Sequence, residues 1–419
     1  MQVTELMATN TVFDVQKVRA DFPILSMEVY GKPLIYLDNA ASAQKPLQVM
    51  NAMNEAMTSG YANVHRGLHY LSNKATDDFE VAREDVRRFL NAPSLEEVIF
   101  TGGATDALNL VAQCYGADHI GEGDEIILSE MEHHSNIVPW QICSEKTGFK
   151  IRYISVKKNG ELDLSNINEL INKKTKLVSL IHQSNVLGTI NPIKEIIQIA
   201  KKQGALTLID AAQTVPHLKV DVKEIDCDFL VFSGHKMVGP TGVGILYGKE
   251  NILDEMEPFM SGGQMINEVN LFSVTFNELP LKFEAGTPNI AQVIGLGKSI
   301  DFISNIGIHN IHEYEAYLTS YALEKFNLND KIELYANSKN QGSVISFNIK
   351  GINAYDLAEF LDQKNIAVRV GHHCAQPLMK ILGVPSTIRI SFYFYNTIEE
   401  IDTLIESIED AIQFFLYRT

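Results

Sequence analysis

The alternation of apolar and polar positions is clearest between residues 97 and 248, where short apolar runs rich in β-branched residues alternate with longer amphipathic stretches. Residues 192–203 are typical of the latter, with Pro192 suited to a first helical turn. Strands that are each followed by a helix form a mostly parallel sheet with helices on both faces. The pattern therefore predicts an α/β fold. The expected strands are 98–101, 125–129, 150–154, 176–181, 206–210, 229–233 and 244–247.

Both flanks of this region have a more helical pattern. Turn-forming residues precede a helix predicted over 290–306, which leads into a second, smaller domain. Near the C-terminal end, apolar residues recur at helical spacing, and Thr397 with Glu400 fits a capping box at the start of that helix. The expected domains are a large one over residues 31–295 and a smaller α/β one made of residues 1–30 and 296–419.

Composition and charge narrow the class of partner. The chain has 419 residues, with 35 Lys and Arg against 52 Asp and Glu, and a net charge of −17. Nucleic acids and anionic membranes select for basic surfaces, so we expect neither as the main partner. The N-terminal segment does not have the pattern of a targeting sequence, and no apolar run approaches the roughly 20 residues of a membrane span. The expected location is the cytoplasm.

The cysteines are far apart and never spaced as C-x-x-C. This spacing argues against a disulfide scaffold and a structural zinc site, and we expect no bound metal. Taken alone, each cysteine is expected to be a small buried apolar residue in a reducing compartment. The four are Cys114, Cys143, Cys227 and Cys374.

Polar residues follow several predicted strands, at the edge where open α/β sheets bind ligands. The first strand runs into Gly102-Gly103-Ala104-Thr105, a turn that lets backbone N–H groups approach a phosphate, although such turns are also common as purely structural features. The second strand is followed by His133 and His134, which lack the spacing of a metal site. A stacking or proton-transferring histidine is the favoured interpretation.

Two further strand ends carry ionisable residues. Asp210 ends an apolar run, where it either caps the next helix or faces a cation such as a pyridinium nitrogen. Lys236 follows another apolar strand together with Ser233 and His235; it is either a surface lysine or an amine that loses its charge and forms a Schiff base. The occurrence of all four residues in one series of strand ends favours the functional interpretation.

These residues carry a family resemblance. Ser233-Gly234-His235-Lys236, with Asp210 and Gln213 upstream, resembles the class V aminotransferase family of pyridoxal-phosphate (PLP) enzymes. Longer motifs, spread from about residue 15 to the C-terminal end, are similar to the SUF-type (group II) cysteine desulfurases. The resemblance implies fold type I of the PLP-dependent transferases, with PLP bound in the large domain. The motifs are YLDNAA at 36–41, NVHRG at 63–67, EHHSNIVPW at 132–140, SNVLGT at 184–189, FEAGTPN at 283–289 and RVGHHCAQP at 369–377.

The resemblance also implies a role for each residue around PLP. Lys236 would hold PLP as an internal aldimine and move protons, and Asp210 would keep the pyridine nitrogen protonated. His133 would stack on the ring, and Gln213 would hydrogen-bond the phenolic oxygen. The phosphate would be held by Thr105, Ser233 and His235, and by Thr287 of a second subunit.

The implied reaction converts L-cysteine to L-alanine and leaves a persulfide on Cys374, the nucleophile, which joins Lys236 and His133 as a catalytic residue. The implied assembly is a homodimer that supplies sulfur for iron–sulfur clusters. The segment around Cys374 is short, so a sulfur-accepting protein of the SUF system must insert its own cysteine. The alternatives are a selenocysteine or cysteine-sulfinate lyase on the same scaffold, and a non-catalytic PLP-binding protein. The implied substrate-binding residues are His65, Arg66, Asn185, Arg369 and Arg389, the last as a planar fork for the carboxylate.

Overall fold

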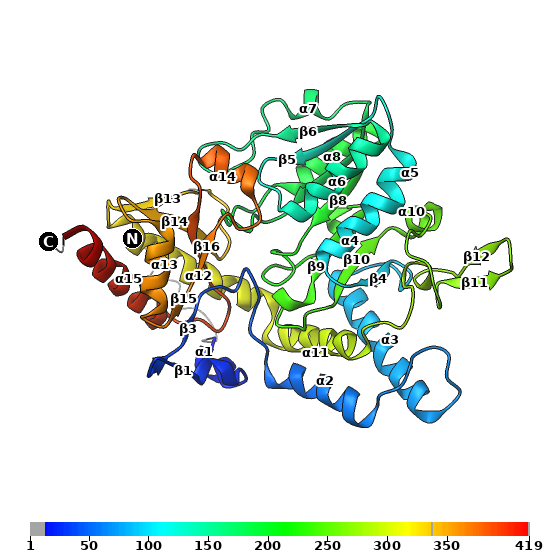
Figure 1. Cartoon of the computed structure of the whole chain (residues 1–419), viewed down its shortest axis with the longest axis horizontal. Helices are drawn as coiled ribbons and strands as arrows, with labels where there is room; N and C mark the ends of the chain where they lie inside the picture. Colours follow the sequence, from blue (N-terminus) through cyan, green and yellow to red (C-terminus); the bar gives the residue numbers. More distant parts are fainter. Residues whose placement is uncertain (1–12, 337, 418–419) are drawn as a thin grey trace.

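The larger of the two main sheets forms the body of the molecule (Figure 1). The computed structural model describes residues 13–336 and 338–417. Strand β10 runs antiparallel to both of its neighbours, and the other neighbouring strands of this sheet are parallel. The predicted α/β fold with a mostly parallel sheet is thus confirmed. In sheet order the strands are β4 (Val98–Thr101), β10 (Gly244–Gly248), β9 (Phe229–Ser233), β8 (Leu206–Asp210), β7 (Thr175–Ile181), β5 (Glu125–Ser129) and β6 (Lys150–Ile154).

Both faces of this sheet are buried, because its strands are apolar on both sides. Leu230 and Phe232 of β9 share a core with α3 and α11, whereas Phe229 and Val231 share a core with α4 and α6. Helix α11 packs against α2 and α3 on the first face (Figure 1). The covering helices are α2 (Leu47–Ser59), α3 (Tyr70–Leu90), α4 (Ala104–Val111), α6 (Val138–Thr147), α8 (Ile193–Gln203) and α11 (Ile290–Ile306).

The second main sheet is antiparallel, in the order β13-β14-β17-β16. Helix α15 on this sheet begins with the predicted capping box: Thr397 accepts from the Glu400 N–H, and the Glu400 carboxylate accepts from the Thr397 N–H. The strands are β13 (Ile332–Leu334), β14 (Val344–Ile349), β16 (Arg369–Gly371) and β17 (Thr387–Ser391); the helices are α12 (Ile308–Asn327), α13 (Ala354–Asp362), α14 (Gln376–Leu382) and α15 (Ile398–Ile412).

The N-terminal part of the chain joins this second sheet region. Strand β3 (Ile35–Tyr36) pairs in parallel with β15 (Ile366–Ala367), and Asp38 forms an isolated bridge with Ser391 at the end of β17. The first 12 residues of the segment expected in the smaller domain lie outside the described residues. Within the described part of the chain, no helix has both the length and the apolarity needed to cross a membrane.

Candidate active site

A cavity of about 260 Å³ lies where the carboxyl ends of β8 and β9 face the segment between β16 and α14. Residues from both main sheets therefore share one space, although they are far apart in the sequence. The predicted site residues on its walls are Thr105, His133, Asn185, Asp210, Gln213, Ser233, His235, Lys236, Arg369, Cys374 and Arg389.

One end of the cavity is built as an anion cradle. Helix α4 begins directly after Gly103, and the Ala104 N–H donates to Ser233 Oγ over 2.8 Å. The neighbouring strand is close: a Cβ on Gly244 would lie 2.4 Å from Gly103 Cα, so only glycine fits there. Thr105 Oγ1 lies 2.7 Å from Ser135 Oγ. A helix N-terminus surrounded by side-chain hydroxyls is suited to a phosphate.

Asp210, which also lines the cavity, is only 3% exposed, and its Oδ1 accepts the Ala212 N–H over 3.0 Å. Burial raises the pKa of Asp210, and the Ala212 N–H and the charge of Lys236 act against this rise. Within residues 13–336 and 338–417 it has no salt-bridge partner. A buried carboxylate without a contacting cation suits a cationic ring nitrogen.

Lys236 ends the short 3₁₀ turn Gly234–Lys236 that follows β9, and it lines the same cavity. Burial lowers the pKa of its amine to about 8; the charge of Asp210 opposes this change, and the charge of Arg389 adds to it. A lysine with this pKa is a neutral amine for an appreciable fraction of the time near neutral pH. The amine is therefore able to attack an aldehyde and to carry protons.

His133 is held in one orientation by its own turn. Its Nδ1 accepts the Ser135 N–H over 3.1 Å and lies 3.0 Å from Ser135 Oγ. Burial, and then the charge of Lys236, lower the pKa of His133 to about 3, so the ring is neutral at physiological pH. A neutral, fixed imidazole on the cavity wall suits a stacking role. Sequence reasoning did not assign a role to Ser135.

A buried polar network that sequence reasoning also missed supports this turn. Glu132 Oε2 accepts from the Ile181 N–H over 2.8 Å and from Asn136 Nδ2 over 2.7 Å. Asn136 Oδ1 in turn accepts from Trp140 Nε1 over 3.0 Å. Burial raises the pKa of Glu132 to about 8, against the hydrogen bonds from Ser129 and Asn136. In the sequence, the four-residue spacing of Glu132, Asn136 and Trp140 is the signal that indicates contact among these side chains.

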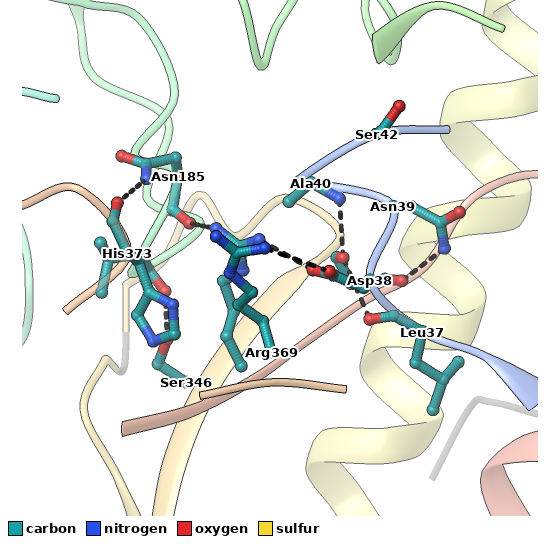
Figure 2. Close-up of polar contacts among 12 residues, drawn as sticks. Leu37, Asp38, Asn39, Ala40, Ser42, Asn185, Ser346, Arg369 and His373 are labelled. Carbon is teal, nitrogen blue, oxygen red and sulfur yellow. Dashed lines mark hydrogen bonds and ion pairs between the residues drawn. The ribbon is translucent and has the colours of Figure 1, made fainter. Parts of the chain in front are cut away.

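A cluster of charged and amide groups lies at the Arg389 end of the cavity, and Asp38, Asn185, Arg369 and His373 are seen together there (Figure 2). Arg389 Nη2 donates to Asp38 Oδ1 over 3.1 Å, and Nη1 donates to the Asn185 carbonyl over 3.0 Å. Arg369 Nη1 lies 3.8 Å from Asp38 Oδ2. Asp38 belongs to the YLDNAA motif, which sequence reasoning quoted without giving this residue a role.

Some polar atoms of the cavity walls are buried and unpaired. Arg389 Nε, Asn185 Oδ1 and Gln213 Oε1 have no hydrogen-bond partner among the described residues. Gln213 Nε2 donates to the Ala40 carbonyl over 2.7 Å, which fixes the amide in place. Buried unpaired polar groups are costly, and their position here suits a polar ligand.

Cys374 lies in the short loop between β16 and α14, and its backbone is strained. His373 has φ +51° and Cys374 φ +56°, a left-handed conformation that side chains with a Cβ disfavour. Hydrogen bonds hold this loop in place. The His134 N–H donates to the Cys374 carbonyl over 2.7 Å, and Asn185 Nδ2 donates to the His373 carbonyl over 2.7 Å. In addition, His373 Nε2 lies 2.8 Å from Thr387 Oγ1. The structure therefore holds this thiol at one place on the cavity wall.

The other three cysteines are buried in the core, as the sequence predicts, whereas Cys374 is partly exposed. Burial raises the pKa of Cys114 to about 11 and that of Cys227 to about 12, and it also raises the pKa of Cys143. These three are inert thiols at neutral pH.

Three predicted site residues do not line this cavity. Thr287 is exposed, in the segment before α11. His65 Nε2 lies 2.9 Å from Glu80 Oε1, and Arg66 next to it is exposed. The structure of one chain therefore places these residues on a separate surface.

The fold and the cavity together define the class of protein. The sheet is seven-stranded and mostly parallel, with Lys236 after β9, the buried Asp210 at the end of β8 and an anion cradle at the N-terminus of α4. This is the arrangement of a fold type I PLP enzyme. The sequence model of the Aminotransferase class-V family matches residues 35–404. The chain belongs to that family, as the sequence analysis predicts.

Relatives and solved structures resemble the chain over nearly its whole length. A probable cysteine desulfurase of Halalkalibacterium halodurans is 50% identical over 95% of this chain and 98% of its own. A probable cysteine desulfurase of Synechocystis sp. is 47% identical over 99% of this chain and 98% of its own. The crystal structure of the cysteine desulfurase CsdA from Escherichia coli superposes with a TM-score of 0.90 at 35% identity, covering 97% of this chain and 100% of that one. The apo cysteine desulfurase of Thermococcus onnurineus NA1 has a TM-score of 0.91 at 39% identity, with 97% and 99% covered.

Proposed function

We propose that this chain is a PLP-dependent cysteine desulfurase of the SUF type, which converts L-cysteine to L-alanine and receives the sulfur as a persulfide on Cys374. The observation that carries this proposal is the convergence of Lys236, Cys374 and Arg389 on one cavity, from two different sheets. An amine, a thiol and a carboxylate-binding guanidinium are the groups that desulfuration of an amino acid requires. Relatives with this activity in their names support it.

The residues of the cavity fit PLP. Thr105, Ser233 and His235 would hold the phosphate at the anion cradle, and Asp210 would pair with the ring nitrogen. His133 would cover the ring with its neutral imidazole, and the Gln213 amide would contact the phenolic oxygen. When bound, PLP supplies the electron sink that draws electrons from the substrate Cα.

The chain's own groups would then position the substrate and transfer its protons and sulfur. Arg389 binds the substrate carboxylate. Lys236, as a neutral amine, accepts the proton from the substrate Cα and later donates a proton back. The Cys374 thiolate attacks the substrate sulfur, so that a sulfur–sulfur bond forms as the Cβ–S bond breaks. A proton added at Cβ completes alanine, and the persulfide stays on the fastened loop.

A homodimer is part of the proposal. Thr287, His65 and Arg66 would complete the cavity of a second copy, since they lie away from the cavity of their own chain. Leu68 near them is fully exposed, and Leu271 and Phe272, at the tip of the hairpin β11 (Ile266–Val269)–β12 (Val274–Phe276), are more than nine-tenths exposed. That hairpin projects from the body of the molecule (Figure 1). Exposed apolar side chains in such numbers favour an interface.

The sulfur acceptor is proposed to be a dedicated protein of the SUF system, and the destination of the sulfur to be iron–sulfur clusters. The Cys374 loop is short, and hydrogen bonds from the His134 N–H and the Asn185 amide hold its backbone beside the cavity. The acceptor must therefore bring its own cysteine to the cavity. A free thiol requires a reducing compartment, which agrees with a cytoplasmic location.

The proposal is tested by incubating the purified protein with L-cysteine and locating the persulfide by mass spectrometry. We expect it on Cys374, with equimolar alanine, and we expect Cys374→Ala to bind PLP normally and lose cysteine turnover. The matched control is Cys143→Ala, a change at a buried thiol that leaves turnover intact. Full cysteine turnover by Cys374→Ala would contradict the persulfide role. If Cys374→Ala loses cysteine turnover but keeps selenocysteine turnover, selenocysteine lyase activity is a second function of the same site.

A further inference from the structure

Arg83 on α3 is a fully buried arginine with a two-point contact to a buried glutamate. Its Nη1 lies 2.6 Å from Glu284 Oε1, and its Nη2 lies 2.9 Å from Glu284 Oε2. The Arg83 side chain is 0% exposed and that of Glu284 is 3% exposed. Such a pair is stable only when the remaining donors are satisfied. Arg83 meets this condition, because Nε donates to Glu80 over 2.9 Å and Nη1 also donates to the Val98 carbonyl over 2.8 Å.

The same pair covers the open edge of the large sheet. Strand β4 is an edge strand, so its outward backbone groups have no neighbouring strand. Arg83 Nη1 donates to the Val98 carbonyl, and Glu284 Oε1 accepts from the Phe100 N–H over 2.8 Å. Glu284 is thereby fastened to the sheet itself, three positions before Thr287.

A second branch leads from Arg83 to the other residues that lie outside the cavity. Glu80 Oε1 lies 2.9 Å from His65 Nε2, and Gln264 Nε2 donates to His65 Nδ1 over 3.2 Å. Burial opposes the ionisation of Glu80, but the His65 hydrogen bond and the charge of Arg83 lower its pKa to about 2. Glu80 is therefore ionised at neutral pH and pairs with the charged Arg83.

The two branches meet again beside Thr287. The Gly286 N–H donates to the Gly263 carbonyl over 2.8 Å, and Gly263 is the neighbour of Gln264 in the sequence. Asn289 Nδ2 donates to the Gly242 carbonyl over 2.5 Å, which anchors the far end of the segment. The closed ring runs through Glu284, Arg83, Glu80, His65, Gln264, Gly263 and Gly286.

We propose that the buried Arg83–Glu284 pair is a positioning device for one preformed unit that enters the cavity of a second copy of this chain. The unit contains Thr287, for the cofactor phosphate, and also His65 and Arg66, which the proposed function assigns to the substrate. The inference rests on the proposed function, which assigns Thr287 to the partner's phosphate. The Thr287 hydroxyl is exposed and is hydrogen-bonded to no residue that the structure describes, so it is available to a ligand. Arg83 and Glu284 themselves touch neither cofactor nor substrate; they act through Thr287.

The first test compares binding of PLP with binding of pyridoxal, which lacks the phosphate. We expect Glu284→Gln and Arg83→Lys to raise the dissociation constant for PLP by about tenfold, the size of one lost hydrogen bond to a charged group, and that for pyridoxal by less than about twofold. Thr287→Ala should reproduce this pattern, and the Thr287→Ala/Glu284→Gln double variant should add little. Equal weakening of both ligands, or no change in either, would overturn the proposal.

The control lies on the same helix. Arg87, one helical turn beyond Arg83, forms an ion pair with Glu84 over 2.6 Å, and both side chains are partly exposed. Its other hydrogen-bond acceptor is the Ala92 carbonyl rather than a residue of the 284–287 segment. Arg87→Lys and Glu84→Gln should leave both dissociation constants unchanged. If Glu284→Gln does not fold, two other variants allow the same comparison of PLP with pyridoxal. Arg83→Lys keeps the positive charge but loses the two-point contact, and Thr287→Ala changes only an exposed side chain.

The second test asks whether the pair acts on its own cavity or on that of a partner. Glu284→Gln and Lys236→Ala subunits with different tags are co-expressed, and the mixed dimers are isolated. In a mixed dimer the intact Thr287 unit of the Lys236→Ala chain faces the intact cavity of the Glu284→Gln chain. We expect one PLP site of wild-type affinity per dimer. The absence of such a site, or a wild-type protein that is monomeric, would overturn the inference, because the pair would then act in its own chain.

These readouts concern cofactor binding, so they separate this inference from the proposed function. A wild-type protein that binds PLP and shows the expected pattern, but produces no alanine from cysteine, would contradict the desulfurase proposal and leave the positioning role standing.

Discussion

Arg389 and Asp38, 351 positions apart in the sequence, form a direct contact of 3.1 Å between Nη2 and Oδ1. Asp38 therefore accepts a hydrogen bond from one terminal nitrogen of Arg389, the arginine that we propose binds the substrate carboxylate. The other terminal nitrogen is fixed by the Asn185 carbonyl, and Nε is left unpaired. The guanidinium is oriented before substrate arrives, and Arg369, 3.8 Å from the other carboxylate oxygen, keeps the cluster net positive.

This contact leads to a prediction about substrate affinity. Asp38→Ala should raise the KM for L-cysteine about tenfold with a smaller effect on kcat, because the Arg389 fork loses the acceptor that holds its plane. Asp38→Asn keeps one oxygen acceptor and should change KM by less than about threefold. Steady-state kinetics on the two variants check this. An unchanged KM in Asp38→Ala would show that Asn185 alone orients the arginine.

Cofactor capture should depend on pH through Lys236. Because burial lowers the pKa of this amine to about 8, we expect the rate at which the apo protein takes up PLP to rise as pH increases to about 8 and to level off above it. The rise follows the neutral amine, which is the reacting form. Absorbance measurements of PLP uptake between pH 6.5 and 10 test this, with Lys236→Ala as the variant that lacks the bound-cofactor band. A rate still rising steeply at pH 10 would mean an ordinary lysine.

Asp210 should cost the apo protein stability. Burial raises its pKa in the folded state, so the folded form binds the proton more tightly than the unfolded form. This penalty is absent below the unfolded pKa and grows as pH rises through the folded pKa. Asp210→Asn should therefore increase the free energy of unfolding of the apo protein at pH 7 while weakening PLP binding. Denaturant unfolding of the two apo proteins provides the measurement. A less stable Asp210→Asn protein would show that the carboxylate is well compensated.

The left-handed backbone of Cys374 should be measurable as strain. At φ +56° a residue with a Cβ is penalised by about 1 kcal/mol relative to glycine, less the extra chain entropy of glycine in the unfolded state. We expect Cys374→Gly to be at least as stable as Cys374→Ala in thermal unfolding, with both inactive on cysteine. A Cys374→Gly protein that is clearly less stable than Cys374→Ala would show that glycine's entropy in the unfolded state outweighs the strain at this position.

Much of the fold could be predicted because its signals are local. The strand at 206–210 and the helix at 290–306 lie where the apolar pattern placed them, since strand and helix periods depend on neighbouring residues alone. Asp210 and Lys236 could also be predicted to meet, because parallel strands present their carboxyl ends at one edge of a sheet. The family motifs extended this prediction to the rest of the cavity.

The sequence by itself thus determined the elements of the large sheet and the chemistry carried at its edge. Only the tertiary structure decided that Asp38 faces Arg389, because that contact depends on how β3 and the bridge to Ser391 join the N-terminal segment to the second sheet. It likewise separated Thr287 and His65 from the cavity and tied them together through Arg83. Long-range pairings of this kind are set by packing and by the satisfaction of buried charges, which no short window of sequence records.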